Sequence, residues 1–174
     1  MPDANIQSQM TEHFLQDNQY PLSILSFDNI EILLAQKDIR FITPDYTFEK
    51  NTLPEKHLGY ITDYSTNKGQ HTGEAGKKLN AYAFCSELKL IKTFPEQKPQ
   101  CVILKHSRGE IAVLCRKIRN ITLNNIHIQT IPQCMNSTRM PLTHLCLYQE
   151  PENDPKLGMM SNADSLFNYI LNYV

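Results

Sequence analysis

The chain has 174 residues, of which 41% are hydrophobic and 20% are charged. These fractions are typical of a folded domain and exclude an intrinsically disordered chain. The formal net charge of −1 provides no overall field that would attract nucleic acid or an anionic membrane. We therefore expect a single folded domain, or two small lobes that share one core.

The N-terminal segment, residues 1–19, is polar and has no sustained hydrophobic period, so we expect it to be an extension of the domain. Its start lacks the basic and apolar regions of a secretion signal, and the apolar runs of the chain are too short to span a bilayer. The five cysteines include no close pair, which favours reduced, mostly buried thiols over a disulfide framework. We expect a cytoplasmic protein.

Paired apolar runs of strand length predict two β-hairpins, formed by residues 22–27 with 30–34 and by residues 101–106 with 111–115. The first pair is separated by Asp28 and Asn29, which are residue types that tolerate a tight turn. The second pair flanks a turn that contains Gly109, which can supply the positive φ that such a turn needs.

The two hairpins are related to each other by a constant shift along the sequence, which places Ile24 on Ile103 without gaps. Under this shift, eight positions of the segment 24–43 carry the same residue as their equivalents in the segment 103–122. The identical pairs are Ile24 with Ile103, Leu25 with Leu104, Glu31 with Glu110, Ile32 with Ile111, Ile39 with Ile118, Arg40 with Arg119, Ile42 with Ile121, and Thr43 with Thr122. Either two hairpins share their composition by necessity, or the chain holds two similar β units, each with a hairpin, a tight basic turn and a third strand. A single long shift is typical of paired lobes rather than of a solenoid.

The remaining apolar runs predict further strands and one helix. Strands are expected at residues 58–61, 79–84, 126–131 and 142–148. The polar segment 62–78 is expected to be an exposed loop. A C-terminal helix over about residues 162–174, with Ser161 or Asn162 as its N-cap, is predicted from a stripe formed by Leu166, Phe167, Ile170, Leu171 and Val174. The predicted class is mainly β with minor helix.

No residue pattern in the sequence indicates catalysis. Residues 73–78 resemble a phosphate-binding loop only in part, because that motif needs a glycine where His71 stands and a serine or threonine where Lys78 stands. The six histidines show no metal-ligand spacing with one another or with the cysteines. We therefore expect a protein that is not an enzyme and has no metal site. A metal-dependent enzyme that uses cysteines and histidines is an alternative that metal analysis would test.

A small β-barrel that binds single-stranded nucleic acid is the alternative function from another class. A local basic cluster is formed by Lys105, Arg108, Arg116, Lys117 and Arg119. Tyr82 and Phe84 alternate along a predicted strand, where their rings could stack on bases. The same cationic residues also fit an ordinary strand edge, which carries charge to prevent aggregation.

The order of these elements resembles the CheW-like domain of bacterial chemotaxis coupling proteins. The likeness covers about residues 20–174 and is one of spacing and texture. It is carried by the first hairpin leading to Ile39, the segment Leu58-Gly59-Tyr60-Ile61, the strand Asn80-Ala81-Tyr82-Ala83-Phe84, the second hairpin leading to Ile118, the proline at Ile131-Pro132, and a final element near Gly158-Met159.

This resemblance implies two packed five-stranded β-barrel lobes with short helices and a C-terminal helix, interleaved in one domain over residues 20–174. Members of the family are not enzymes, and we expect no cofactor. They connect methyl-accepting chemoreceptors to a chemotaxis-type histidine kinase through barrel surfaces and the groove between the lobes. Positions close to those interfaces are matched by Ile39, Leu58, Gly59 and Ile61, which could equally be core or turn residues.

Two departures from the family pattern change the expectation. After Gly59 and Ile61 the family continues with an Asn-Leu-Arg-Gly stretch, whereas residues 62–65 here read Thr-Asp-Tyr-Ser. The second hairpin of typical members ends in Val-Asp-Arg-Val, whereas residues 115–118 here read Cys-Arg-Lys-Ile. Arg116 thus stands where the family has an acidic residue, which reverses the sign of any local ion pair. We count Arg116 among the predicted partner-binding residues. We expect a divergent coupling protein, of the type IV pilus-linked subgroup that serves twitching motility.

Overall fold

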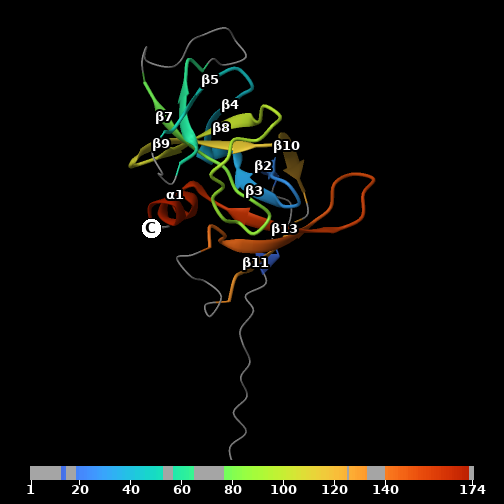
Figure 1. The fold of residues 1–174 in the computed structure, drawn as a ribbon. Helices are drawn as coiled ribbons and strands as arrows, with labels where there is room; N and C mark the ends of the chain where they lie inside the picture. The colour runs from blue at the N-terminus through green and yellow to red at the C-terminus, as the bar shows by residue number, and fades with distance from the viewer. Residues whose placement is uncertain are drawn as a thin grey trace, which may run out of the picture.

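The computed structural model describes residues 13–14, 19–52, 57–64, 77–124, 126–132 and 140–172. In these residues the chain forms two β-sheets and one α-helix, α1 (Ala163–Asn172). The two sheets form two packed lobes, and α1 lies at their junction (Figure 1). The predicted mainly β class, with two packed lobes and a C-terminal helix, is therefore confirmed.

Two sheets, here called sheet A and sheet B, form the lobes. Within the described residues, sheet A has the order β1 (His13–Phe14), β11 (Ile126–Thr130), β12 (His144–Tyr148), β13 (Lys156–Ser161), β3 (Glu31–Ala35), β2 (Tyr20–Ser26) and β10 (Lys117–Leu123). Sheet B has the order β4 (Ile39–Thr43), β8 (Gln100–His106), β9 (Gly109–Cys115), β7 (Leu79–Tyr82), β6 (Gly59–Thr62) and β5 (Thr47–Lys50). A short 3-10 helix, η1 (Gln36–Asp38), precedes β4. These described sheets hold seven and six strands, more than the five expected for each lobe.

The two halves of the chain fold alike. The order β11-β12-β13-β3-β2-β10 in sheet A matches the order β5-β6-β7-β9-β8-β4 in sheet B strand for strand. The hairpin registers agree as well, since Leu25 lies opposite Ile32 and Leu104 lies opposite Ile111. The constant shift between the hairpins therefore marks two similar β units rather than a chance likeness of composition, and the repeat extends beyond the hairpins to this whole strand order.

In each half, the third strand pairs with the hairpin of the other half. Strand β4 follows the first hairpin but pairs with β8, where Ile39 lies opposite Leu104. Strand β10 follows the second hairpin but pairs with β2, where Ile118 lies opposite Leu25. These two pairs are equivalent under the repeat. A β-bulge at Arg40 then moves the rest of β4 out of the equivalent register.

The repeated charged residues form ion pairs across this exchange. Arg119 on β10 pairs with Glu31 on β3, with 3.2 Å between Nη2 and Oε1. Arg40 on β4 pairs in the equivalent way with Glu110 on β9. Arg119 makes a second ion pair with Glu150 at 2.6 Å. Each exchanged strand is thus tied by its arginine to the hairpin of the other half.

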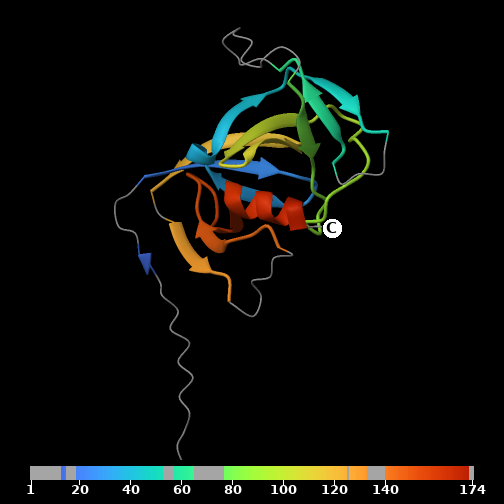
Figure 2. The same cartoon turned by 90° about the vertical axis from the view of Figure 1, so that its left-hand side faces the viewer.

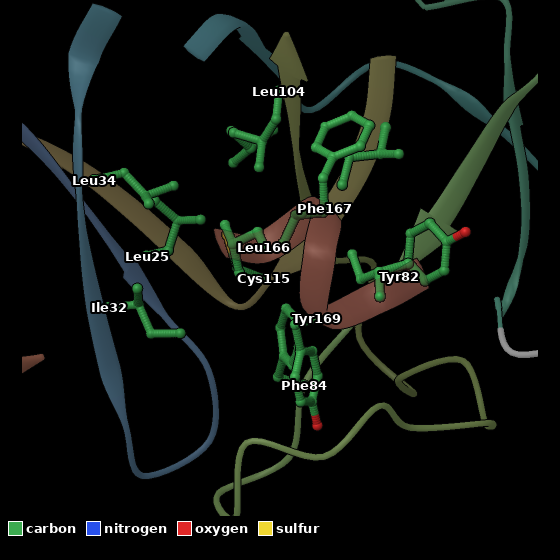
Figure 3. Close-up of a cluster of buried hydrophobic side chains, with 14 of the residues drawn as sticks. Leu25, Ile32, Leu34, Tyr82, Phe84, Leu104, Cys115, Leu166, Phe167 and Tyr169 are labelled. Carbon is green, nitrogen blue, oxygen red and sulfur yellow. The ribbon is translucent and has the colours of Figure 1, made fainter. Parts of the chain in front are cut away.

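Three hydrophobic cores follow from this arrangement. The core of sheet A includes Leu22, Ile24, Leu33, Leu123, Ile126, Cys146 and Tyr148. The core of sheet B includes Leu58, Ile61, Tyr64, Leu79, Ala81, Cys101, Ile103, Ala112 and Leu114. The third, here called the inter-lobe core, combines both sheets with α1 and includes Leu25, Ile32, Leu34, Tyr82, Phe84, Leu104, Ile111, Val113, Cys115, Leu166 and Phe167. Figure 3 shows Leu25, Ile32 and Leu34 on one side of this core, and Leu166 extends from α1 between the walls.

Helix α1 begins at a doubly capped N-terminus. The Ser165 backbone N–H donates to Asn162 Oδ1 at 2.8 Å, so Asn162 is the N-cap. The Ala163 N–H donates to Asp38 Oδ2 at 3.2 Å, and this carboxylate also favours the positive end of the helix dipole. Because Asp38 belongs to η1, the cap connects α1 to the point where the chain crosses from sheet A to sheet B. Figure 2 shows α1 across the junction of the two lobes.

The buried face of α1 differs from the predicted stripe. Leu166, Phe167 and Ile170 are buried as expected, but Leu171 is 49% exposed and Tyr169 takes its place in the core. The Tyr169 hydroxyl reaches the surface of the core, where it donates to the Leu88 carbonyl at 2.8 Å. An amphipathic aromatic ring that buries its apolar body and donates a hydrogen bond from its hydroxyl therefore lies on the buried face, outside the predicted stripe.

Several predicted elements need correction or lie outside the description. The apolar runs do not predict strands β5 and β13, and β1 lies in the segment expected to be an extension. Most of the predicted loop 62–78, including most of the partial phosphate-loop motif, lies outside the described residues, as does Val174. The turn glycine Gly109 has the expected positive φ of 127°.

Replacing Gly59 with alanine is expected to destabilise the fold. A Cβ at Gly59 would press on the Glu49 carbonyl oxygen and lie 2.8 Å from the Phe48 ring, so β5 would have to move. We expect a loss of about 2–3 kcal/mol in the free energy of unfolding, measured by urea denaturation. The control Thr47→Ala, exposed on the paired strand, should cost under about 1 kcal/mol. Equal urea midpoints for Gly59→Ala and Thr47→Ala would contradict this account of Gly59.

Arg119→Ala is expected to lower stability and to change its pH dependence. The Arg119 hydrogen bonds hold the pKa of Glu150 below its ordinary value. The ionised carboxylate therefore stabilises the native state above its ordinary pKa, and this contribution is lost as the pH falls through the lowered value. Arg119→Ala should cost about 1–2 kcal/mol at neutral pH and should show a shallower loss of stability in acid.

Arg40→Ala is the matched control, because the Arg40 side chain is 43% exposed while that of Arg119 is 26% exposed. Its cost should stay below about 1 kcal/mol. Urea midpoints measured from neutral to acidic pH test both variants. If the urea midpoint of Arg119→Ala fell with decreasing pH in parallel with that of the wild type, the assigned role of the ion pair between Arg119 and Glu150 would be contradicted.

Candidate functional site

A cavity of about 300 Å³ lies beside the crossing from β9 to β10. Three segments line it: the turn of the first hairpin at Phe27 and Asp28, the connection that follows β7, and residues 114–116 at the end of β9. Phe27, Phe84 and Cys115 belong both to this lining and to the inter-lobe core. The cavity is therefore an opening at the edge of the core that the two lobes share.

The cavity combines an apolar wall with a charged lining. The Phe27 and Phe84 rings meet edge to face, with centroids 5.5 Å apart. The charged side chains in the lining are Asp28, Glu96, Lys98 and Arg116. Such a site suits a large apolar side chain that is flanked by charged groups, because the apolar part leaves water and the charges pair at the edge.

Arg116 stands at the crossing itself. Its backbone N–H donates to the Ser26 carbonyl at 2.8 Å, which fixes the chain where it passes from sheet B to sheet A. The residue is exposed. Its guanidinium makes no ion pair or hydrogen bond with the residues that the structure describes, whereas Arg119 is held by two carboxylates. The guanidinium of Arg116 is therefore available to an external anion.

The other predicted partner-binding residues do not line this cavity. Ile39 is half-buried at the start of β4, where it packs against the inter-lobe core. Leu58 and Ile61 are 4% and 0% exposed inside the core of sheet B. Gly59 is buried between β5 and β7. The structure thus places Arg116 at an open site, Ile39 at the other crossing, and the remaining three residues in and around the core of sheet B.

The predicted basic cluster is dispersed in the structure. Arg108 lies in the β8–β9 turn and Arg116 lies at the far end of β9, about 25 Å of extended chain away. Arg119 is neutralised by Glu31 and Glu150. No continuous basic groove of the kind that follows a nucleic-acid backbone is therefore formed by these residues.

The predicted base-stacking residues are buried. Tyr82 is 7% exposed and Phe84 is 3% exposed, and both belong to the inter-lobe core. The Phe84 ring lies 6.0 Å from the Tyr169 ring of α1. Neither ring presents a face to solvent on which a base could stack. The structure therefore supports neither of the two features on which the nucleic-acid alternative depends, the basic cluster and the stacking rings.

Metal-ligand groups and membrane spans were also sought. In the part of the chain that the structure describes, no group of three or more His, Cys, Asp or Glu side chains could hold a metal ion. His71 and Cys134 fall outside that part. Among the described helices, none has the length and apolar character needed to cross a membrane.

Of the residues that line the cavity, the sequence singles out Arg116 as a partner-binding residue and Phe84 only as a base-stacking residue of the nucleic-acid alternative. Phe27 is expected from the sequence only as a strand residue, and Ile91 and Lys98 lie in a stretch for which it predicts no element. One signal is present in the sequence: the stretch between residues 84 and 100 contains Pro95 and Pro99, which disfavour a helix there. An irregular connection at this point leaves space at the edge of the core.

Comparisons with known proteins give the fold. No family model matches the chain, and no curated protein matches it in sequence. Among solved structures, the fold is similar to that of the scaffolding protein TtCheW from Thermoanaerobacter tengcongensis, with a TM-score of 0.56 and 13% identity. The match covers 82% of this chain and 88% of that one. The fold is CheW-like. This likeness confirms the resemblance inferred from the order of elements, and at this identity it concerns the fold alone.

The cysteines are expected to differ in reactivity. Burial raises the pKa of Cys101 to about 12 and that of Cys146 to about 11, and it also raises the pKa of Cys115. Since the thiolate is the reactive form, iodoacetamide at about pH 8 should modify half-buried Cys85 in the native protein, and should modify the buried thiols Cys101, Cys115 and Cys146 only after unfolding. Peptide mass spectrometry would measure this order. Native-state labelling of Cys115 would show that the cavity is deeper and more open to reagent than described.

Proposed function

We propose that this protein is a non-enzymatic cytoplasmic adaptor in a chemosensory signalling array. It couples methyl-accepting chemoreceptors to a chemotaxis-type histidine kinase, in chemotaxis or in pilus-linked twitching motility. Its mechanism is protein–protein contact, in which partners bury apolar surface at exposed edges and at the junction of the lobes.

The CheW-like fold is the observation that supports this proposal most. Its match to a scaffolding protein extends over both lobes, at 82% of this chain. The lobes are connected by two exchanged strands, so a contact on one lobe acts on strands whose hairpins lie in the other. Such a connection suits an adaptor that passes small shifts between two partners.

The predicted partner-binding residues have two different roles in this proposal. Arg116 contacts a partner directly, since its guanidinium is exposed at the cavity. Ile39 is half-buried at the start of an exchanged strand and contributes to the junction between the lobes. Leu58, Gly59 and Ile61 are buried, so they act by shaping the surface of sheet B.

Purification from the native host tests the proposed function. The tagged protein is purified at moderate salt, and the proteins that accompany it are identified by mass spectrometry. Recovery of a chemotaxis-type histidine kinase or a methyl-accepting receptor is the expected result. Recovery of nucleic acid, lost steeply between about 50 and 200 mM salt, would favour the alternative, because phosphate contacts depend on salt. Absence of both signalling partners would contradict the coupling role.

Arg116→Glu should weaken partner recovery, whereas Arg108→Glu should not. Both variants change the charge by the same amount on an exposed residue, but Arg108 lies in the β8–β9 turn, away from the cavity. We expect at least about fivefold less kinase or receptor with Arg116→Glu, because a charge at an interface edge steers association. Equal losses in the two variants would indicate a general charge effect rather than a specific contact.

A further inference from the structure

The cavity beside the crossing from β9 to β10 has the size and the apolar floor of a small-molecule site. Its volume of about 300 Å³ lies at the lower end of the range of about 300–1,000 Å³ that such sites span. The floor is made of buried residues that are each at most 4% exposed, namely Phe27, Ala83, Phe84, Leu114 and Cys115. Burial raises the pKa of the Cys115 thiol, so the floor carries no charge at neutral pH. An apolar group can therefore enter the cavity without displacing a charged side chain.

Backbone hydrogen bonds hold each of the three segments that line the cavity. In the turn of the first hairpin, the Phe27 N–H donates to the Ile30 carbonyl at 3.0 Å. In the connection that follows β7, the Ile91 N–H donates to the Ala83 carbonyl at 2.9 Å. At the end of β9, the backbone N–H of Arg116 is held in the same way at 2.8 Å. Because these walls are fixed before a ligand arrives, little conformational freedom is lost on binding.

Charged groups of both signs line the cavity together with this floor, and they do not neutralise one another. Asp28, Glu96 and Arg116 are exposed. Their side chains make no ion pair or hydrogen bond with the residues that the structure describes. The fourth charged group, Lys98, places its ammonium over the Tyr46 ring, 4.6 Å from the centroid. A simple anion would meet two carboxylates and a simple cation would meet a guanidinium, so a ligand that carries both charges is the better match.

We propose that the cavity binds a free amino acid with a large apolar side chain. That side chain lies against Phe27 and Phe84. The carboxylate of the ligand pairs with Arg116, and its ammonium pairs with Asp28 and Glu96. An α-amino acid carries its two charges at one end of an apolar body, which matches an apolar floor that has charges of both signs beside it. This ligand site goes beyond the proposed function, which assigns no small molecule to the protein.

Phenylalanine is a suitable probe, together with analogues that each lack one of its features. Hydrocinnamate lacks the ammonium, phenylalaninamide lacks the carboxylate, and glycine lacks the apolar side chain. Each compound is titrated into the ¹⁵N-labelled full chain and followed by amide chemical shifts. Phenylalanine should shift the amides around Phe27, Phe84 and Arg116, and it should bind at least about fivefold more tightly than any analogue. Phenylalaninamide also represents the first residue of a peptide, so tighter binding of the amide would overturn the proposal in favour of a peptide N-terminus.

Variants at exposed residues make the test specific. Arg116→Gln should weaken the binding of phenylalanine and hydrocinnamate about fivefold and should not weaken that of phenylalaninamide. The double change Asp28→Asn with Glu96→Gln should instead weaken the binding of phenylalanine and phenylalaninamide. The control Arg108→Gln, in the β8–β9 turn, should change none of these affinities. No shifts at about 10 mM phenylalanine, shifts centred elsewhere, equal affinities for all four compounds, or unchanged affinities in the cavity variants would each overturn the proposal.

The outcome is separable from that of the proposed function, because ligand binding is measured on the purified chain alone. If phenylalanine fails to bind but kinase or receptor accompanies the native protein, only the ligand site is wrong. If phenylalanine binds at the cavity but no signalling partner is recovered, the site stands and the coupling role is wrong. If both are found, the amino acid and the partner compete for Arg116, and phenylalanine should lower the recovery of the partner.

Discussion

The reciprocal exchange of β4 and β10 is the constraint on which the rest of the structure depends. Each of these strands pairs with a hairpin from the other half of the chain, so neither sheet is complete without both halves. The ion pairs of Arg40 with Glu110 and Arg119 with Glu31 secure the same two crossings. Because a single half would leave a hairpin with an unpaired edge, we expect the two lobes to fold as one unit rather than as two independent domains.

The inter-lobe core is a consequence of this exchange. Its central residues are equivalent pairs under the repeat, such as Leu25 with Leu104 and Leu34 with Val113, so both halves contribute the same face of the same hairpin. Residues one position away, such as Ile24, lie instead in the core of a single lobe, because successive side chains of a strand point to opposite faces. Helix α1 then covers this shared core from one side only.

Local sequence patterns predict much of this fold. Contacts between segments that are distant in the sequence could not be predicted from it. The two hairpins and α1 follow from short periodic runs, whereas β5 (Thr47–Lys50) is short and mixed and β13 (Lys156–Ser161) contains a glycine, so neither has a strong strand pattern. The identities of Glu31 and Arg40 with their counterparts were visible, but their pairing across the exchange required the topology. The cavity could not be predicted, because three segments that are distant in the sequence line it and only the topology brings them together.

The two crossings share a backbone plan and differ in charge. At the first crossing Asp38 accepts a hydrogen bond from the N-terminus of α1, and the helix neutralises it from within the chain. At the second crossing Arg116 and Lys117 have no such internal counterpart in charge: Arg116 has no described side-chain partner, and no helix follows β7. Unlike the buried positions of the repeat, which remain apolar because packing demands it, these exposed positions are free to diverge. Their divergence separates a crossing whose Asp38 accepts a hydrogen bond from α1 from one whose Arg116 makes no ion pair within the described residues.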